Sequence, residues 1–281
     1  MRIRSLPAVS AVIVLLSLAF HSNARAANLL FGDEFNARPT SANYDFGFWW
    51  GDSYGPNDPD SQFRLDYSQV QVSNGMLQIT AQKTASRDNW NVMRPYTSGQ
   101  LSTNGHFSAS SYYVEMSAKL PYATGAWPAL WTLPANHNDG LAEVDAVEYV
   151  GPSSGNDVTV AWHGGGIDSA HDFAPGFDPS KGFHRYGVWS RAGSLQWYID
   201  GKLVHTYSNP VIPGNVPQYF MITLQVGGPW AGTATFAQQT MQVDYLHVFD
   251  TLPTSTPEPA SALVLLACAA ACSLSRYARN R

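Results

Sequence analysis

The sequence predicts an all-β domain in the form of a β-sandwich. Short runs of β-branched and aromatic residues alternate with Gly, Pro, Asn and Asp, and no stretch keeps a helical period beyond two turns. Two hairpins are evident, because residues 70–79 contain a central Asn-Gly and residues 195–204 a central Asp-Gly. These pairs tolerate the positive φ angles of a type I′ turn. Many short strands separated by such turns are typical of a sandwich.

Further strands and two loops are predicted along the rest of the chain. The strands cover residues 112–119, 143–149, 158–163, 184–189, 219–224 and 241–249, and the loops cover residues 164–181 and 209–217. No internal repeat and no linker divides residues 27–250. Because this length suits one large all-β domain, we expect a single domain there.

The N-terminus has the pattern of a secretory signal peptide. Arg2 and Arg4 precede an apolar run at residues 9–20, and residues 24–26 form a small-x-small triplet of the kind that signal peptidase accepts. The run is shorter than the ~20 residues that a membrane-spanning helix needs, which disfavours an N-terminal anchor. The sequence therefore predicts that residues 1–26 are a signal peptide and that the protein is exported.

The C-terminal residues 251–281 have three parts: Pro257-Glu258-Pro259, an apolar stretch at 260–274, and an end that contains three Arg. This order resembles the sorting signals of exosortase substrates, which implies an exosortase-type processing enzyme as a partner. We then expect a secreted or cell-surface protein of a Gram-negative bacterium, with transient membrane association through the tail. The alternative is a plain transmembrane helix that anchors the tail, with its basic end in the cytoplasm.

Composition narrows the classes of partner. The two cysteines, Cys268 and Cys272, lie in the tail, so the folded domain is predicted to have no disulfide and no thiolate metal site. The net charge of -5 is modest, and no run of Lys or Arg indicates nucleic acid as a partner. Aromatic residues make up 13% of the chain, the same percentage as the charged ones. Such rings stack on sugars, although they also fill β cores. The domain is expected to be a monomer.

Three acids stand in the otherwise apolar residues 141–151. Carboxylates are unfavourable in such a segment unless they have a use. As a helix, the segment would leave Glu143 on the far side from Asp145 and Glu148. As a strand, it places Glu143 and Asp145 on one face. One β-bulge near Ala146–Val147 would bring Glu148 to the same face. The spacing therefore predicts a strand whose three acids line one groove.

Two carboxyl groups in one groove suit a retaining glycosidase. Such an enzyme needs them ~5–5.5 Å apart, so that one attacks the anomeric carbon and the other protonates the leaving oxygen. Asp145 lies between the two Glu residues in sequence. It can share a proton with Glu143 and keep the pair in different ionisation states. The residues alone leave two alternatives open, a solvated acidic strand and a cation site.

This segment resembles the signature of family 16 of the glycoside hydrolases, in the form that carries the bulge. Other stretches match the family in the same order, and these are Asp33-Glu-Phe35, Tyr96-Thr-Ser-Gly99, Ala118-Lys-Leu-Pro121, Gly125-Ala-Trp-Pro-Ala-Leu-Trp-Thr-Leu-Pro134, Trp197-Tyr-Ile-Asp-Gly201, Leu224-Gln-Val-Gly-Gly228 and Met241-Gln-Val-Asp-Tyr245. The resemblance implies a concanavalin-like jelly roll with a concave substrate cleft and no catalytic cofactor. It assigns the roles of nucleophile, helper and acid/base to Glu143, Asp145 and Glu148.

Several aromatic residues and one histidine are candidates for contact with sugar. Trp127 and Trp131 are four residues apart in a strand-like run, so both can face one side, as a sugar platform or as core. The resemblance favours the cleft for Trp127 and leaves Trp131 open. It also implies that His163, beside a Gly-rich turn, lies near the sugar at the cleavage point. Candidates for the edge of the cleft are Trp230 and the pair Trp49–Trp50.

The resemblance further implies a structural calcium ion on the convex face. Relatives often bind it through a glycine carbonyl after an Asn-Gly-like turn and an aspartate in the last strand, which here are Gly75 and Asp244. Hard oxygen ligands suit this ion. The histidines His137, His171 and His184 show no spacing that indicates a metal site.

The stretch around Trp127 looks most like the laminarinase-like members, which implies a polysaccharide substrate, β-1,3- or mixed β-1,3/1,4-glucan. Galactan hydrolases and transglycosylases share the three acids and remain alternatives. A non-catalytic lectin would keep the aromatic residues without needing Glu143 and Glu148, so the presence of both argues against it. The sorting tail also suggests another alternative, that the protein is a structural component of an exopolysaccharide matrix.

Overall fold

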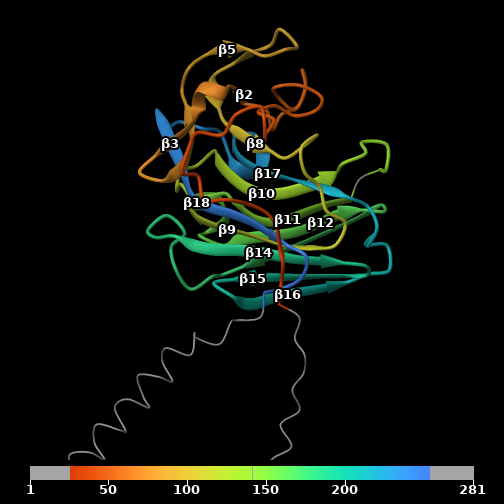
Figure 1. Cartoon of the computed structure of the whole chain (residues 1–281). Coiled ribbons are helices and arrows are strands. Elements are labelled where there is room, and N and C mark those ends of the chain that lie inside the picture. Colours follow the sequence, from red (N-terminus) through yellow and green to blue (C-terminus); the bar gives the residue numbers. More distant parts are fainter. Residues whose placement is uncertain (1–25, 141, 254–281) are drawn as a thin grey trace, which may run out of the picture.

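The computed structural model of the chain describes residues 26–140 and 142–253 (Figure 1). Two large sheets pack face to face, which confirms the predicted β-sandwich. The ten-stranded sheet has the order β16-β15-β14-β9-β18-β4-β7-β2, with β1 beside β18 and β3 beside β4. The six-stranded sheet has the order β13-β12-β11-β10-β17-β8. Neighbouring strands are antiparallel, except β2 and β7, which run parallel.

The bounds of the elements follow sheet by sheet. The ten-stranded sheet contains β16 (Lys202–Ser208), β15 (Ser194–Ile199), β14 (His184–Arg191), β9 (Tyr112–Lys119), β18 (Gln238–Phe249), β4 (Met76–Gln82), β7 (Tyr96–Ser98), β2 (Phe63–Leu65), β1 (Leu29–Asp33) and β3 (Val70–Ser73). The six-stranded sheet contains β13 (Ile167–Phe173), β12 (Val158–Gly164), β11 (Ala142–Tyr149), β10 (Ala126–Pro134), β17 (Gln218–Val226) and β8 (Gln100–Ser102). The small elements are the pair β5 (Ser86–Arg87) and β6 (Met93–Arg94), and the single helical turns η1 (Tyr67–Gln69), η2 (Gly151–Ser154) and α1 (Gly228–Ala231).

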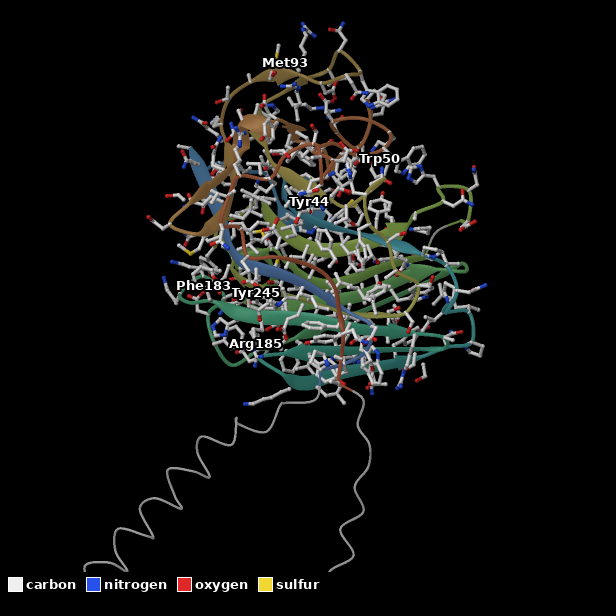
Figure 2. All side chains as sticks on the ribbon, viewed as in Figure 1. Tyr44, Trp50, Met93, Phe183, Arg185 and Tyr245 are labelled. Carbon is white, nitrogen blue, oxygen red and sulfur yellow. The ribbon has the colours of Figure 1, made fainter. Side chains whose placement is uncertain are left out.

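The core fills the space between the two sheets (Figure 2). Along β11, Val144 and Val147 point into it and are fully buried. Because successive side chains of a strand alternate between faces, the opposite face of the six-stranded sheet is free to carry the acids. Burial of the apolar face thus fixes the register of β11, since a slip of one residue would turn the acids into the core.

Both predicted hairpins are present. Asn74 and Gly75, between β3 and β4, have φ angles of 55° and 69°. Asp200 and Gly201, between β15 and β16, have φ angles of 50° and 76°. The positive angles at both central positions are those of a type I′ turn. The other predicted strands lie in β9, β11, β12, β14, β17 and β18, and residues 209–217 form a loop as predicted.

The prediction of a loop over residues 164–181 is wrong. Residues Ile167–Phe173 form β13, which pairs with β12 along its whole length after a turn at Gly165 and Gly166. β13 is an edge strand of its sheet, and all of its residues are at least partly exposed. A polar edge strand is held by its backbone hydrogen bonds to one neighbour, so it lacks the apolar alternation that makes other strands recognisable.

Two predictions fall outside the described residues. The signal peptide at residues 1–26 lies there apart from Ala26, and so does the tail from residue 254 onward, with both cysteines and the Pro-Glu-Pro motif. Within residues 26–140 and 142–253, none of the helices combines the length and the apolar character that a membrane span needs.

Candidate active site

A cleft of about 900 Å³ lies over the six-stranded sheet, and Glu143, Asp145 and Glu148 all line it. The predicted bulge is what brings them together. Asp145 lies opposite Ala161 of β12 and Glu148 opposite Thr159, so that two residues of β11 face one residue of β12. The extra residue returns Glu148 to the face of the other two acids. The structure therefore brings the three acids to one groove, as the spacing predicts.

The three strands β11, β12 and β13 present their cleft side chains in rows. Glu143 is paired with His163, and His163 with Asp168. Glu148 is paired with Thr159, and Thr159 with Asp172. Between these rows lie Asp145 and two alanines, Ala161 and Ala170. Each glutamate thus shares its row with an aspartate on the edge strand, and small side chains leave the middle row open.

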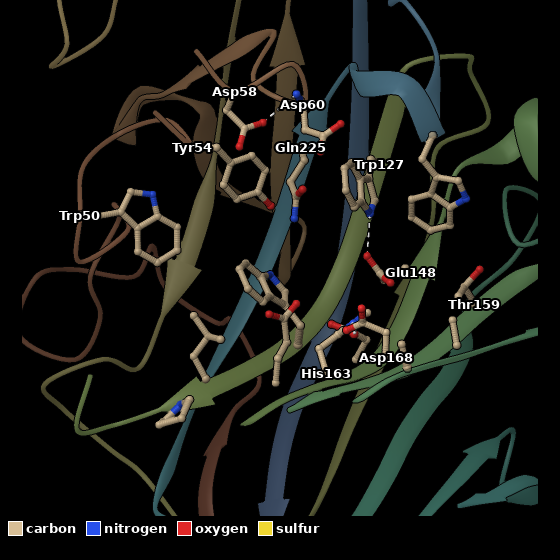
Figure 3. A pocket seen from close by; sticks show the side chains of 18 of the residues that line it. Trp50, Tyr54, Asp58, Asp60, Trp127, Glu148, Thr159, His163, Asp168 and Gln225 are labelled. Carbon is tan, nitrogen blue, oxygen red and sulfur yellow. Dashed lines mark hydrogen bonds and ion pairs between the residues drawn. The ribbon is translucent and has the colours of Figure 1, made fainter. Parts of the chain in front are cut away.

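Hydrogen bonds hold the acids at both the side chain and the backbone. The indole N–H of Trp127 donates to Glu148 Oε1 at 2.9 Å (Figure 3). Trp197 of β15, in the other sheet, donates from its indole N–H across the core to the carbonyl oxygen of Asp145 at 2.8 Å. A bulge interrupts the regular ladder. The contact from Trp197 therefore gives a backbone acceptor beside the bulge a buried partner.

His163 links the buried Asp145 with the edge strand. Its Nδ1 lies 3.0 Å from Asp168 Oδ1, and its Nε2 lies 3.3 Å from Asp145 Oδ2. The second contact does not have the geometry of a hydrogen bond, so Asp145 Oδ2 is buried without a hydrogen-bond partner. The structure thus places His163 at the acids, as the resemblance implies, and adds Asp168 as the residue that orients it.

Burial dominates the electrostatics of the three acids. It raises the pKa of Asp145 to about 8. Burial first, and then the charge of Asp145, raise the pKa of Glu143 and of Glu148 well above the ordinary range. Three carboxyl groups so close together cannot all be ionised near neutral pH. The site therefore keeps at least one proton, which is what a general acid requires.

The predicted aromatic residues take different positions at the cleft. Trp127 and Trp131 both line it, and Trp230 on α1 lies edge-to-face with Trp127 at 5.0 Å. Trp230 is 39% exposed and stands at the rim. Trp131 is also a core residue, since it is buried and its ring lies 6.2 Å from that of Phe48. Trp49 and Trp50 line the cleft as well.

Several lining residues were not predicted from the sequence, and these are Tyr54, Asp58, Asp60, His137, Thr159, Asp168, Asp172 and Gln225. Tyr54 lies within reach of the charges of the acids, because those of Glu143 and Glu148 add to burial in raising its pKa. A signal for Gln225 existed, since it lies within the matched stretch 224–228. Tyr54 and the aspartates before β2 come from an irregular segment that shows no periodic pattern.

Among the described residues, one group of His, Cys, Asp or Glu side chains has the spacing of a metal site. It consists of Glu143, Asp145 and His163, whose ligand atoms lie within 4.8 Å of one another. An ion bound there would coordinate the carboxylate of Glu143, the residue to which the resemblance assigns the role of nucleophile. The predicted calcium ligands lie elsewhere: β18 pairs with β4 as far as Val243 and Leu77, so Asp244 and Gly75 stand just beyond that pairing. Asp244 is exposed, and calcium at this place stays a prediction.

Comparisons with known proteins agree with this geometry. A profile of glycosyl hydrolases family 16 matches residues 57–247. A glucan endo-1,3-beta-glucosidase A1 of Niallia circulans is 29% identical, over 79% of this chain and 38% of that protein. An endo-1,3-1,4-beta-glycanase of Rhizobium meliloti is 30% identical, over 78% of this chain and 51% of that protein. The chain thus spans about half or less of these relatives.

Solved structures show the same fold. The laminarinase catalytic domain from Thermotoga maritima is 26% identical and superposes with a TM-score of 0.68, over 81% of this chain and 99% of that chain. This likeness confirms the jelly roll that the resemblance implies.

Proposed function

The chain belongs to family 16 of the glycosyl hydrolases, and on that premise we propose that it is an exported endo-glycoside hydrolase that cleaves β-1,3- or β-1,3/1,4-glucan with retention of configuration. One observation carries the proposal: three carboxyl groups meet in one cleft because a bulge in β11 turns Glu148 to the face of Glu143 and Asp145. The substrate class is suggested by the names of two relatives, a glucan endo-1,3-beta-glucosidase and an endo-1,3-1,4-beta-glycanase.

The chemistry divides between the two glutamates. Glu148, whose raised pKa keeps its proton and whose Oε1 is held by Trp127, protonates the oxygen of the leaving sugar. Glu143 attacks the anomeric carbon and forms the glycosyl-enzyme. Glu148, now ionised, then takes a proton from water, and the resulting nucleophile releases the sugar with its original configuration.

Asp145 serves as the helper. Burial raises the pKa of Asp145 as well as that of Glu143, so the two carboxyl groups can share a proton near neutral pH. When this proton lies on Asp145, Glu143 attacks as a carboxylate. The Nε2 atom of His163 lies 3.3 Å from Asp145 Oδ2, so the imidazole contacts the helper. Its Nδ1 faces Asp168, so the Nε2 side of the ring is directed at the acids.

Product analysis tests this function. The protein is incubated with laminarin, lichenan, agarose and carrageenan, and the products are sized and followed by proton NMR from the first minutes. We expect oligosaccharides of mixed length from laminarin, lichenan or both, with the β-anomer appearing before mutarotation. Initial α-anomer would contradict retention, and cleavage of a galactan alone would replace the glucan substrate.

We also propose that the protein is secreted or held at the cell surface, with the tail processed by an exosortase-type enzyme. The support is the sequence of the two ends, a signal-peptide pattern and the Pro257-Glu258-Pro259 motif followed by an apolar run and Arg residues. Mass spectrometry of surface protein is expected to find a C-terminus near Pro259. Recovery of intact Arg281 on the mature protein would contradict processing.

For calcium we propose a structural role away from the acids, with Gly75 supplying a backbone carbonyl and Asp244 a carboxylate. A ligand that binds only the folded state raises the melting temperature. A chelator is therefore expected to lower the melting temperature and to leave initial rates nearly unchanged while the protein stays folded. Immediate loss of turnover without unfolding would place the ion at the acids instead.

A further inference from the structure

The cleft is rich in carboxyl groups beyond the three acids of β11. Four aspartates also line it, namely Asp58, Asp60, Asp168 and Asp172. Asp58 and Asp60 precede β2, and Figure 3 shows them across Glu148 from Asp168. No Lys or Arg stands among the described residues that line the cleft. Negative charge therefore faces the cleft from both sides, without a Lys or Arg among the described lining residues to balance it.

Two acceptor atoms in the cleft are buried and lack a hydrogen-bond partner. These are Gln225 Oε1 and Asp145 Oδ2, and their residues are 2% and 1% exposed. The amide nitrogen of Gln225 is already engaged, since it donates to Thr223 Oγ1 at 3.2 Å. A buried polar atom without a partner is unfavourable, so a ligand that supplies hydrogen-bond donors is favoured here.

The hydroxyl groups of a sugar match these atoms. A hydroxyl both donates and accepts, so it pairs with the amide oxygen of Gln225 and with Asp145 in either protonation state. A sulfate ester or a carboxylate offers only acceptor oxygens and carries charge. Such a group would meet four aspartates and find no Lys or Arg among the described lining residues.

We infer that this cleft accepts uncharged glycans and excludes those that carry sulfate or carboxylate groups. The inference rests on the proposed function, because it names the substrate class of the same cleft. Asp58, Asp60, Asp168 and Asp172 are then residues that determine specificity, through charge rather than shape. Neutral β-glucan fits the cleft, and the sulfated galactans are excluded.

The test compares laminarin with a portion of the same laminarin that carries sulfate esters at low density. We measure kcat/KM for both at low salt and at high salt. Repulsion between two like charges about 4 Å apart in a water-like medium lowers kcat/KM about fivefold. A sulfate group in the cleft would form several such pairs with the aspartates. We therefore expect a preference for the neutral polymer of about tenfold or more at low salt. Because salt screens charges, the preference shrinks as salt rises. A purely steric clash with sulfate would not respond to salt.

Two variants locate the effect. Asp58→Asn and Asp172→Asn each remove one charge and keep an oxygen that can accept the present hydrogen bond, from Asp60 N and from Thr159 Oγ1 respectively. Each is expected to narrow the preference severalfold, mainly by improving kcat/KM on the sulfated polymer. Glu34→Gln is the matched control, because it removes one negative charge that does not line the cleft. It is expected to keep the wild-type preference.

The outcomes separate this inference from the function itself. Equal rates on the two laminarins, or a preference that neither salt nor the aspartate variants change, would overturn the charge-based exclusion and leave the glucanase function intact. If neither laminarin is cleaved but a galactan is, the proposal of a glucan substrate is wrong. The charge-based exclusion is then tested by comparing kcat/KM on neutral agarose with kcat/KM on sulfated carrageenan. A preference for agarose then supports the inference, and a preference for carrageenan overturns it.

Discussion

The strands β11 and β13 bring carboxyl groups to the same cleft from opposite environments. β11 lies between two neighbours, and its Asp145 is 1% exposed and supported through its backbone by Trp197. β13 is an edge strand, and the side chain of its Asp168 is 84% exposed. Burial raises the pKa values of the acids on β11, so these acids can hold and transfer protons.

An exposed carboxylate in water keeps its charge and acts at a distance. The same residue type therefore serves two purposes within one cleft, and the depth of the strand decides which one. The acids of β11 are expected to determine turnover. The acids of β13 are expected to determine which glycan enters and how His163 is held. Changes in the two strands should then differ in size and in kind.

The largest effect is expected from Glu143→Ala and Glu148→Ala. Both remove a group that reacts with the substrate, so hydrolysis of glucan should fall by about 10³-fold or more. With an activated aryl glycoside, whose leaving group needs no proton, Glu148→Ala still forms the glycosyl-enzyme. Azide then releases a β-azide product, identified by NMR. Glu143→Ala lacks the nucleophile, so azide attacks from the opposite face and gives the α-azide.

The anomer of the azide product decides the assignment. If Glu148→Ala gave the α-azide and Glu143→Ala the β-azide, the two roles would be exchanged. If both variants hydrolysed glucan at the wild-type rate, β11 would not carry the chemistry, and its contrast with β13 would lose its basis.

Asp145→Asn is expected to have the next largest effect, and it tests whether burial sets the charge state. Activity should fall between wild type and the two alanine variants, because both reacting groups remain. In the folded protein Asp145 holds its proton up to about pH 8, whereas a free Asp loses it near pH ~4. The folded state therefore binds this proton more tightly, and the free energy of unfolding falls as pH rises from about 4 to about 8.

Asparagine cannot ionise, so Asp145→Asn is expected to make this fall shallower. Urea unfolding at a series of pH values measures the slope. The two glutamates also have raised pKa values, so part of the slope persists in the variant. An unchanged slope would mean that burial does not hold the proton on Asp145, and the proposed helper role would fail.

A smaller effect is expected from Trp197→Phe, which removes support for β11 from the other sheet. The change leaves the buried carbonyl of Asp145 without the indole donor, a loss that is typically about 1–3 kcal/mol of unfolding free energy. We also expect kcat to fall, because the backbone of the acid strand loses its fixed position. Thermal unfolding and kcat on laminarin measure the two effects. A less stable protein with unchanged kcat would show that the bulge keeps its geometry without Trp197.

The contrast between the two strands also explains what the sequence can predict. The predicted bulge in β11 follows from three acids in an apolar segment, because only a bulge puts Glu148 on the face of the other two. β9 was predicted with its observed bounds, since its apolar and aromatic residues mark a buried strand. β13 was missed, because a strand at the edge needs no apolar alternation. Tyr54, Asp58 and Asp60 were missed because tertiary packing alone carries their irregular segment to the cleft.

The smallest effect is expected from Asp168→Asn, which tests whether β13 acts on catalysis through His163. An exposed ion pair contributes little to stability, so the melting temperature should stay close to that of wild type. The hydrogen bond to His163 Nδ1 is weakened, and kcat/KM on neutral laminarin is expected to fall a few fold. The kcat/KM of His163→Asn should be lower still, because this change also removes the ring nitrogen near Asp145. If Asp168 acts only by orienting His163, adding Asp168→Asn to His163→Asn should cause no further loss. If the kcat/KM losses of the two single variants multiply in the double variant, Asp168 affects the reaction independently of His163. The edge strand β13 would then do more than select the glycan and orient His163.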